Sequence, residues 1–106
     1  MPAFRWLDDA RSEALAVAQE YAEIDADLGV DLWGRSEQKL AFALRFPHTG
    51  KHVHEVAELE LRQHFLHRFK YTLVLAVLPQ ELVVVAFHHQ RQDAEYWKPR
   101  LEKVQP

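Results

Sequence analysis

The richest group of chemically capable side chains lies in the last fifth of the sequence. Residues 88–101, HHQRQDAEYWKPRL, directly follow the apolar run ELVVVAF and hold two His, two Arg, one Tyr and one Trp. His89 and Arg91 share one face if the preceding strand continues, because side chains alternate along a strand. Histidine titrates near neutral pH, and arginine is a permanent cation with a planar fork of donors. The pair is therefore a candidate site for an anionic group, and the alternative is that Arg91 only pairs with Asp93 or with a backbone carbonyl.

A basic groove on a sheet would extend this site. Cationic and titratable side chains occur on the segments before the tail, at Arg62, His64, Arg68, Lys70 and Tyr71. Such a groove would hold a phosphodiester or an acidic protein segment. If RNA were cleaved there, His89 or Tyr96 would remove the 2′-hydroxyl proton and Arg91 would stabilise the charged phosphorane, without a metal or another cofactor. In the structural alternative Tyr96 and Trp97 form an aromatic plug of the core, and for Trp97 this alternative is favoured.

Metal chemistry has weaker support in the sequence. His52 and His54 are two apart, with His48 nearby, but no third ligand stands at a fixed spacing. A short acidic run lacks the spacing of a calcium loop: Asp25, Asp27 and Asp31. There is no cysteine, Gly-rich phosphate loop, GxSxG elbow or HExxH motif. The sequence therefore predicts no metal site and excludes most standard enzyme classes.

Two amphipathic helices are expected before these segments. The stretch DDARSEALAVAQEYAEIDADLG repeats apolar residues at steps of three and four, with Asp8 or Asp9 as cap and Gly29 as its end. The stretch VDLWGRSEQKLAFALRF follows and stops at Pro47. Because only three to five residues around Gly29 join them, the helices should form an antiparallel hairpin.

The remaining sequence reads as strands. HVHEV, LELRQHFL, FKYTLVLAVL and ELVVVAFHH are rich in β-branched and aromatic residues or alternate in part, and a tight PQ connection joins the last two. YTLVLAVL is apolar on both faces and should be a central strand. The prediction is a single α+β domain, residues 1–106, in which the helical hairpin packs on an antiparallel sheet of three to four strands. A short helix should begin near Asp93 and carry Tyr96, Trp97 and Leu101.

The charges limit the class of partner. The chain has 106 residues and a formal charge of −3, whereas general nucleic-acid binders show a basic footprint. Acidic residues concentrate in residues 2–31, while residues 62–100 hold six Lys or Arg and four His against three acidic residues, which allows a locally basic face. No apolar run is long enough to span a bilayer, and the first residues lack a signal-peptide core. A cytoplasmic protein without membrane contact is expected.

The order of elements and the tail together resemble the ParE/RelE superfamily, the toxins of type II toxin–antitoxin systems that are often called plasmid stabilisation proteins. The resemblance covers nearly the whole chain. Its most specific part is a pattern of the type HxRRDPxYWxxR, which His89, Arg91, Asp93, Tyr96, Trp97 and Arg100 match, while Gln92 and Ala94 depart from it. HRFKY resembles an RFPY strand start, through Arg68, Phe69 and Tyr71, with Lys70 in place of Pro. The implied fold is a helical hairpin, a small antiparallel sheet and a C-terminal segment.

Two activities occur in this superfamily, and the resemblance implies one or the other. RelE-like members cleave mRNA in the ribosome with basic and Tyr residues, here His89, Arg91 and Tyr96. ParE-like members lack that set and poison DNA gyrase. Because phosphate neutralisation dominates affinity for nucleic acid, the charge of −3 favours the ParE-like branch. The candidate binding residues are Arg62, Arg68, Lys70, Tyr71, Arg91, Trp97 and Arg100.

The resemblance also implies a protein partner. A cognate antitoxin with a disordered tail would fold on the toxin and neutralise it in a hetero-oligomer. Exposed apolar residues on the helical hairpin are the expected contacts, with Trp33, Phe42 and Phe46 as candidates, although at least one of them should lie under the sheet. A member that has lost toxicity and only binds its antitoxin is a third alternative.

Overall fold

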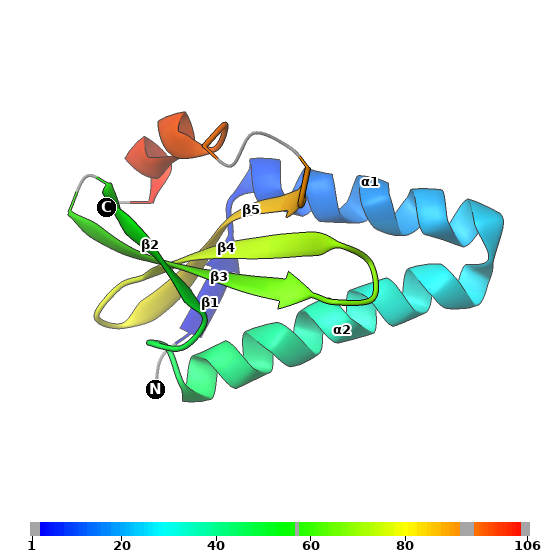
Figure 1. The fold of residues 1–106 in the computed structure, drawn as a ribbon, viewed down its shortest axis with the longest axis horizontal. Coiled ribbons are helices and arrows are strands. Elements are labelled where there is room, and N and C mark those ends of the chain that lie inside the picture. Colours follow the sequence, from blue (N-terminus) through cyan, green and yellow to red (C-terminus); the bar gives the residue numbers. More distant parts are fainter. Residues whose placement is uncertain (1–2, 57, 92–94, 105–106) are drawn as a thin grey trace.

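The computed structural model describes residues 3–56, 58–91 and 95–104 (Figure 1). Along the chain the elements are β1 (Ala3–Trp6), α1 (Asp8–Ile24), α2 (Ala26–Arg45), β2 (Lys51–Val56), β3 (Leu59–Leu66), β4 (Tyr71–Val77), β5 (Glu81–His89) and the 3₁₀ helix η1 (Lys98–Lys103). The five strands form one sheet in the order β1-β5-β4-β3-β2. The class is α+β, as the sequence predicted. Among the described residues, none of the helices combines the length and apolar character needed to cross a bilayer.

The sheet is mixed, so the prediction of three to four antiparallel strands was wrong. β2 to β5 pair antiparallel with their neighbours, but β1 pairs parallel with β5, and Ala3 lies opposite Glu81. β1 was missed because it is only four residues long and has no alternating pattern, with Phe4 half exposed. The prediction of a central strand at YTLVLAVL is confirmed, since β4 lies between β5 and β3.

The two helices meet at Asp25, and the predicted junction at Gly29 was wrong. Asp25 has an extended backbone, its N–H donates to the Tyr21 carbonyl at the end of α1, and its carboxylate accepts from the Asp27 N–H at 2.9 Å at the start of α2. One aspartate therefore ends one helix and caps the next. Gly29 lies inside α2, where a Cβ atom would stand 2.8 Å from the Ala18 carbonyl oxygen of α1. Its missing side chain allows the two helices to approach closely.

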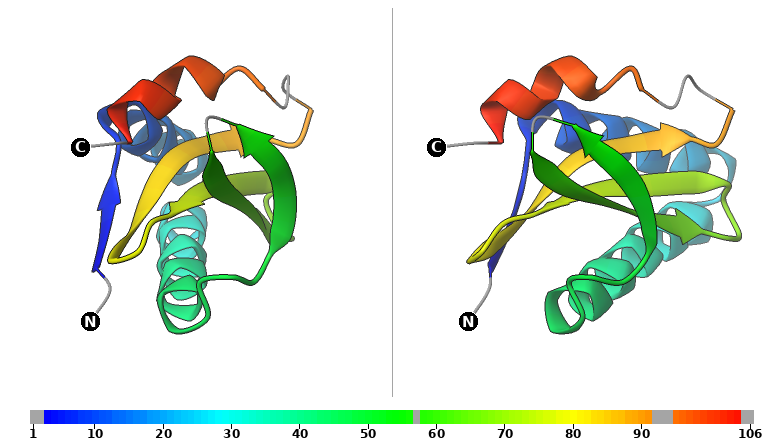
Figure 2. Two further views of the ribbon diagram at one scale, coloured as in Figure 1. Left: turned by 90° about the vertical axis from the view of Figure 1, so that its left-hand side faces the viewer. Right: turned by 60° about the vertical axis from the view of Figure 1, so that its left-hand side comes forward.

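The sheet lies between the helices and the C-terminal segment. α1 packs on β5 and α2 on β3, and η1 lies across the sheet from α2 (Figure 2). Trp97, Leu101 and Val104 of the C-terminal segment are buried, together with the central strands β4 and β5. This segment therefore completes the core.

The C-terminal helix differs from the prediction in type and position. It is a 3₁₀ helix that begins at Lys98, so Tyr96 and Trp97 precede it and only Leu101 lies within it. Pro99 stands in its first turn, the one helical position where proline loses no hydrogen bond. The predicted start near Asp93 falls outside the described residues.

Candidate functional site

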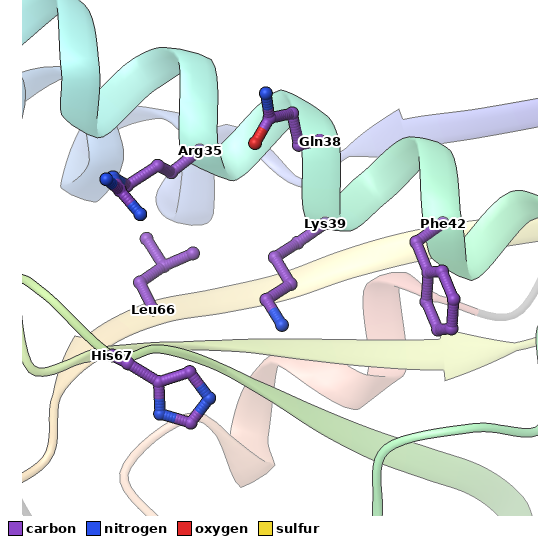
Figure 3. Close-up of a pocket in the computed structure, with 6 residues that line it drawn as sticks. All are labelled: Arg35, Gln38, Lys39, Phe42, Leu66 and His67. Carbon is purple, nitrogen blue, oxygen red and sulfur yellow. The ribbon is translucent and has the colours of Figure 1, made fainter.

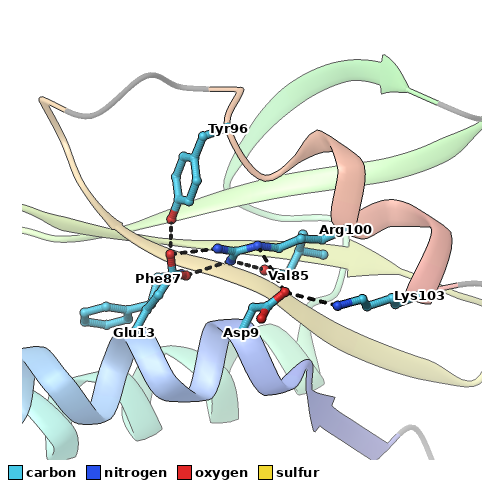
Figure 4. A network of polar contacts seen from close by, with 7 residues as sticks. All are labelled: Asp9, Glu13, Val85, Phe87, Tyr96, Arg100 and Lys103. Atoms are coloured by element: carbon cyan, nitrogen blue, oxygen red, sulfur yellow. Dashed lines mark hydrogen bonds and ion pairs between the residues drawn. The ribbon is translucent and has the colours of Figure 1, made fainter.

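The conspicuous polar cluster of the structure surrounds Glu13, on the side of α1 that faces β5 (Figure 4). The Glu13 carboxylate accepts a hydrogen bond from the Tyr96 hydroxyl at 2.6 Å and from the backbone N–H of Phe87 at 3.1 Å. The Arg100 guanidinium donates to both carboxylate oxygens, at 2.8 and 3.0 Å. We call Glu13, Tyr96 and Arg100 the Glu13 network. It joins α1, the edge of β5 and the C-terminal segment.

The Glu13 network stands where β5 loses its neighbouring strand. β1 ends at Trp6, and its last ladder contact is the bond from the Leu7 N–H to the Val84 carbonyl at 3.0 Å. Val85 is an additional residue of β5, because Ala86 pairs with Val74 and Val84 with Leu75. Its carbonyl accepts from Arg100 at 3.1 Å. Beyond the end of β1, Arg100 thus binds the Val85 carbonyl and Glu13 binds the Phe87 N–H at the edge of β5.

Further ion pairs tie the C-terminal segment to the first elements of the chain. Asp9 of α1 contacts Lys103 at 3.2 Å and Arg100 at 3.6 Å. Arg5 of β1 donates to the Val104 carbonyl at 2.9 Å and to Glu81 at 3.0 Å. Arg100, Lys103 and the Val104 carbonyl therefore bind the C-terminal segment to α1 and β1.

The electrostatics of the network suit a structural contact. Burial would raise the pKa of Glu13, but hydrogen bonds from Arg100, Tyr96 and the Phe87 N–H outweigh it and hold the pKa below its ordinary value. Burial and the bond to Glu13 strongly raise the pKa of Tyr96. The Tyr96 hydroxyl thus keeps its proton and is a poor base in this arrangement. The hydrogen bond to Glu13 also raises the pKa of Arg100, whose charge the carboxylate balances.

His89 and Arg91 do not share a strand face. β5 ends at His89, and Arg91 lies exposed in the following turn. The backbone N–H of Arg91 donates to Nδ1 of His89 at 3.0 Å, so the hydrogen of the neutral ring resides on Nε2. The ring also meets Tyr71 edge to face, with centroids 5.2 Å apart. The basic nitrogen that a proton acceptor needs is therefore already engaged in this conformation.

The other predicted binding residues have partners in different parts of the molecule. Arg62 donates to Glu60 at 2.9 Å and to the Gly50 carbonyl at 3.3 Å. Arg68 pairs with Asp31 on α2, while Lys70 lies exposed in the β3–β4 turn with a positive φ. These three cations do not line one groove with Arg100.

Aromatic candidates are largely engaged in packing. Tyr71 is partly buried and stacks on Phe87, with ring centroids 5.2 Å apart. Trp97 is fully buried, and its Nε1 has no partner among the described residues. As the sequence favoured, Trp97 belongs to the core, and in this conformation a partner cannot reach it.

His64 is more buried than a groove residue would be. Its side chain on β3 is 5% exposed, and its Nε2 finds no partner in the part of the chain that the structure describes. Burial lowers the pKa of His64, and the positive charges of Lys39 and Arg62 lower it further. His64 is therefore a neutral core residue at neutral pH.

The sequence analysis missed Glu13, although the sequence contains a signal for it. Ala10, Ala14 and Val17 mark the buried face of α1, and Glu13 stands three residues after the first and four before the last. A carboxylate on the apolar face of a helix requires a partner, because a buried charge is costly when unpaired. The sequence alone could not identify Arg100 as the partner of Glu13, because the two residues are far apart in the chain.

An apolar groove runs along the outer side of the helical hairpin. Its volume is about 820 Å³, and small and apolar residues of both helices line it, including Leu15, Ala18, Ala22, Val30 and Trp33. We call it the hairpin groove.

The three aromatic residues proposed as antitoxin contacts have different surroundings. Trp33 is partly buried and stacks on Trp6, with ring centroids 5.8 Å apart. Phe42 and Phe46 are about half exposed and touch each other, with centroids 5.1 Å apart. Of the three, Trp33 lies at the hairpin groove, whereas Phe42 and Phe46 form an exposed pair near the end of α2.

No metal centre can be built from the described side chains, because no three His, Asp or Glu among them lie close enough to hold an ion. His48 instead pairs with Glu60 at 2.8 Å, and His52 is exposed. The side chain of His54 lies outside the described residues.

Comparison of the chain with protein-family models and with characterised proteins found no match.

Proposed function

We propose that the chain is a ParE-like toxin of a type II toxin–antitoxin system, which inhibits growth by binding DNA gyrase and is neutralised by a cognate antitoxin. The proposal rests on the resemblance of the tail and of the order of elements, a pair of helices followed by strands β2 to β5 and a C-terminal segment. We place its action in the cytoplasm, where gyrase is found.

One observation favours binding over RNA cleavage. Two of the three residues that a nuclease would use are engaged in contacts within the fold, because the Tyr96 hydroxyl is bound to Glu13 and the Nδ1 of His89 accepts from the Arg91 N–H, while the Arg91 side chain is exposed. General acid–base catalysis needs a group within hydrogen-bond reach of the substrate proton, with a pKa near the working pH. The raised pKa of Tyr96 and the occupied Nδ1 of His89 do not meet these requirements.

The hairpin groove supports the antitoxin part of the proposal. An amphipathic helix can lay its apolar face in such a groove, and a segment that folds on binding can cover the surface around it. The product would be a toxin–antitoxin hetero-oligomer.

Induction of the chain alone in growing bacteria tests the proposal. We expect DNA synthesis to stop before protein synthesis in pulse labelling, with an SOS response, and the purified protein to inhibit supercoiling by gyrase. An early stop in translation with cleaved mRNA would instead identify a ribosome-dependent endonuclease. Normal growth would contradict the toxin and point to a member that only binds its antitoxin.

Replacement of Arg91 tests whether the exposed turn after β5 contacts the target. Arg91→Ala should weaken growth inhibition while the melting temperature stays unchanged, because the side chain is exposed. Arg11→Ala, at an exposed position of α1, is the matched control and should leave both unchanged. Equal toxicity of the two variants would remove Arg91 from the contact surface.

A further inference from the structure

A pocket of about 370 Å³ lies between α2 and the end of β3 (Figure 3). We call it the α2 pocket. Four of its residues come from α2, each within one helical turn of the next, and two come from the end of β3 and the turn that follows: Arg35, Gln38, Lys39, Phe42, Leu66 and His67. It is separate from the Glu13 network and from the hairpin groove.

The α2 pocket has an excess of positive charge. Arg35 and Lys39 are four residues apart, so they stand on the same face of α2, and His67 approaches from the β3–β4 turn. None of the described residues that line the pocket is acidic. Asp31, which does not line the pocket, pairs with both Arg35 and Arg68.

All three basic side chains keep donor groups that are available to a ligand. Within the described part of the chain, Lys39 and His67 make no hydrogen bond or ion pair, and Arg35 is bound only through its Nε. Lys39 is partly buried, whereas Arg35 and His67 are exposed. Three donors from two elements, around one hollow, match the several oxygens of a phosphate better than the two of a carboxylate.

An aromatic wall stands beside these donors. Phe42 follows Lys39 by three residues on α2, and its side chain is 48% exposed. Leu66 is buried beneath the opening. A half-exposed ring next to cationic donors offers a stacking surface for a flat heterocycle.

We infer that the α2 pocket binds a nucleoside 5′-monophosphate group, with the phosphate at Lys39, His67 and Arg35 and the base on Phe42. An extended polyanion is disfavoured, because the chain has a formal charge of −3 and Arg62, Arg68 and Arg100 are each paired with a carboxylate elsewhere in the fold. A single phosphate needs only the local excess of charge. The group can belong to a free mononucleotide or to the 5′-phosphate end of an RNA strand, and the inference does not depend on the proposed gyrase target.

Calorimetry with three probes at constant ionic strength tests the inference. AMP should bind with a lower Kd than either adenosine or inorganic phosphate, because only AMP uses both halves of the pocket. In a heteronuclear NMR titration the amide shifts should concentrate at residues 35–42 and 64–68. A Kd for inorganic phosphate equal to that for AMP would contradict the role of Phe42, and absence of AMP binding at millimolar concentration would overturn the inference.

Paired variants separate the pocket from general electrostatics. Lys39→Gln should raise the Kd for AMP about tenfold, the effect of losing one charge-assisted hydrogen bond. Phe42→Leu should raise it by about tenfold as well, through loss of stacking. Lys51→Gln and Phe4→Leu, at exposed positions outside the pocket, are the matched controls and should change the Kd little. Melting temperatures exclude unfolding, and equal effects of variants and controls would refute the site.

A short oligoribonucleotide distinguishes the two sources of the group. Tight binding of the 5′-phosphorylated strand, with weak binding of the 5′-hydroxyl strand, would identify a strand end. Binding of AMP without either strand would identify a free nucleotide. Both results support the inference, whereas equal binding of the two strands would overturn it, since the terminal phosphate would then contribute nothing.

Discussion

Glu13 has the widest structural role of any single carboxylate described here. It satisfies the Phe87 N–H, holds the Tyr96 hydroxyl and balances the charge of Arg100, so one side chain of α1 fixes both the strand edge and the C-terminal segment. Its side chain is 23% exposed and that of Arg100 is 16% exposed, which keeps water from replacing these bonds freely. Such partly buried ion pairs contribute more than exposed ones when a single partner is removed.

Removal of the Glu13 carboxylate should destabilise the fold. Glu13→Ala leaves Arg100 and the Phe87 N–H without their partner, and we expect the free energy of unfolding to fall by about 2 to 3 kcal/mol. Urea denaturation followed by circular dichroism measures this. Glu23→Ala, at an exposed position of the same helix, is the control and should change stability little. Equal losses in the two variants would show that the network contributes nothing specific.

The Glu13 carboxylate should also make the free energy of unfolding depend on pH in the acid range. Because the pKa of Glu13 is lower in the folded chain than its ordinary value of 4.5, its stabilisation is complete above about pH 4.5 and is lost as the pH falls through the folded-state pKa. The difference in unfolding free energy between the wild type and Glu13→Gln should therefore shrink as the pH is lowered from 6 towards 3 in a denaturation series. A constant difference across this range would contradict the lowered pKa.

His64 should produce a second and separate pH dependence. Its folded-state pKa lies below the ordinary value of 6.5, so the unfolded chain binds the proton first and stability falls as the pH drops below about 6.5. His64→Leu, which removes the titrating ring, should flatten the stability profile between pH 7 and 5. His52→Leu, at an exposed position, is the control and should retain the wild-type slope. An unchanged slope in His64→Leu would show that another group is responsible.

At the scale of elements, the structure differs from the sequence prediction mainly where one element ends and the next begins. The hydrophobic pattern of the two helices runs on past Asp25, and a glycine further along looks like a natural end, but a capping carboxylate ends the first helix four residues earlier. β1 has no internal pattern and exists because β5 provides its hydrogen bonds. Strongly periodic or apolar segments, such as α2 and β4, were predictable from sequence, whereas elements defined by a distant partner were not.

Because α1 and α2 pack closely at Gly29 but not at Gly34, we expect alanine substitutions at these two glycines of α2 to change stability in opposite directions. Gly29→Ala would place a Cβ atom 2.8 Å from the Ala18 carbonyl and from Ala22, and should lower the unfolding free energy by about 1 to 3 kcal/mol. Gly34→Ala meets nothing within 4 Å and should raise it by about 0.5 to 1 kcal/mol, since alanine favours a helix. Thermal denaturation of both variants tests the pair. Stabilisation by Gly29→Ala would show that the helices separate without cost.

At the scale of the whole molecule, two helices and the C-terminal segment cover the sheet, so the polar side chains with potential chemical roles lie around its edges. The class and the order of the helices and the four longer strands followed from apolar patterning, but the proposed groove of basic residues did not assemble. Arg62, Arg68 and Arg100 each found a carboxylate that sequence spacing does not reveal: Glu60, Asp31 and Glu13. The sequence shows which side chains could bind a ligand, whereas the structure shows which of them are already paired with another residue.

The parallel pairing of β1 with β5 also constrains how the chain folds. In this sheet β1 has β5 as its neighbouring strand, and the two are separated by the helical hairpin and three further strands. Local contacts allow the hairpin to form while synthesis continues, but the first strand must wait until residues 81–89 have been made. Only then can Glu13 and Arg100 meet at the same strand edge. Completion of the fold therefore requires β5, and a nascent chain that stops before β5 leaves β1 without its neighbouring strand and exposes the apolar side chains that β5 would cover.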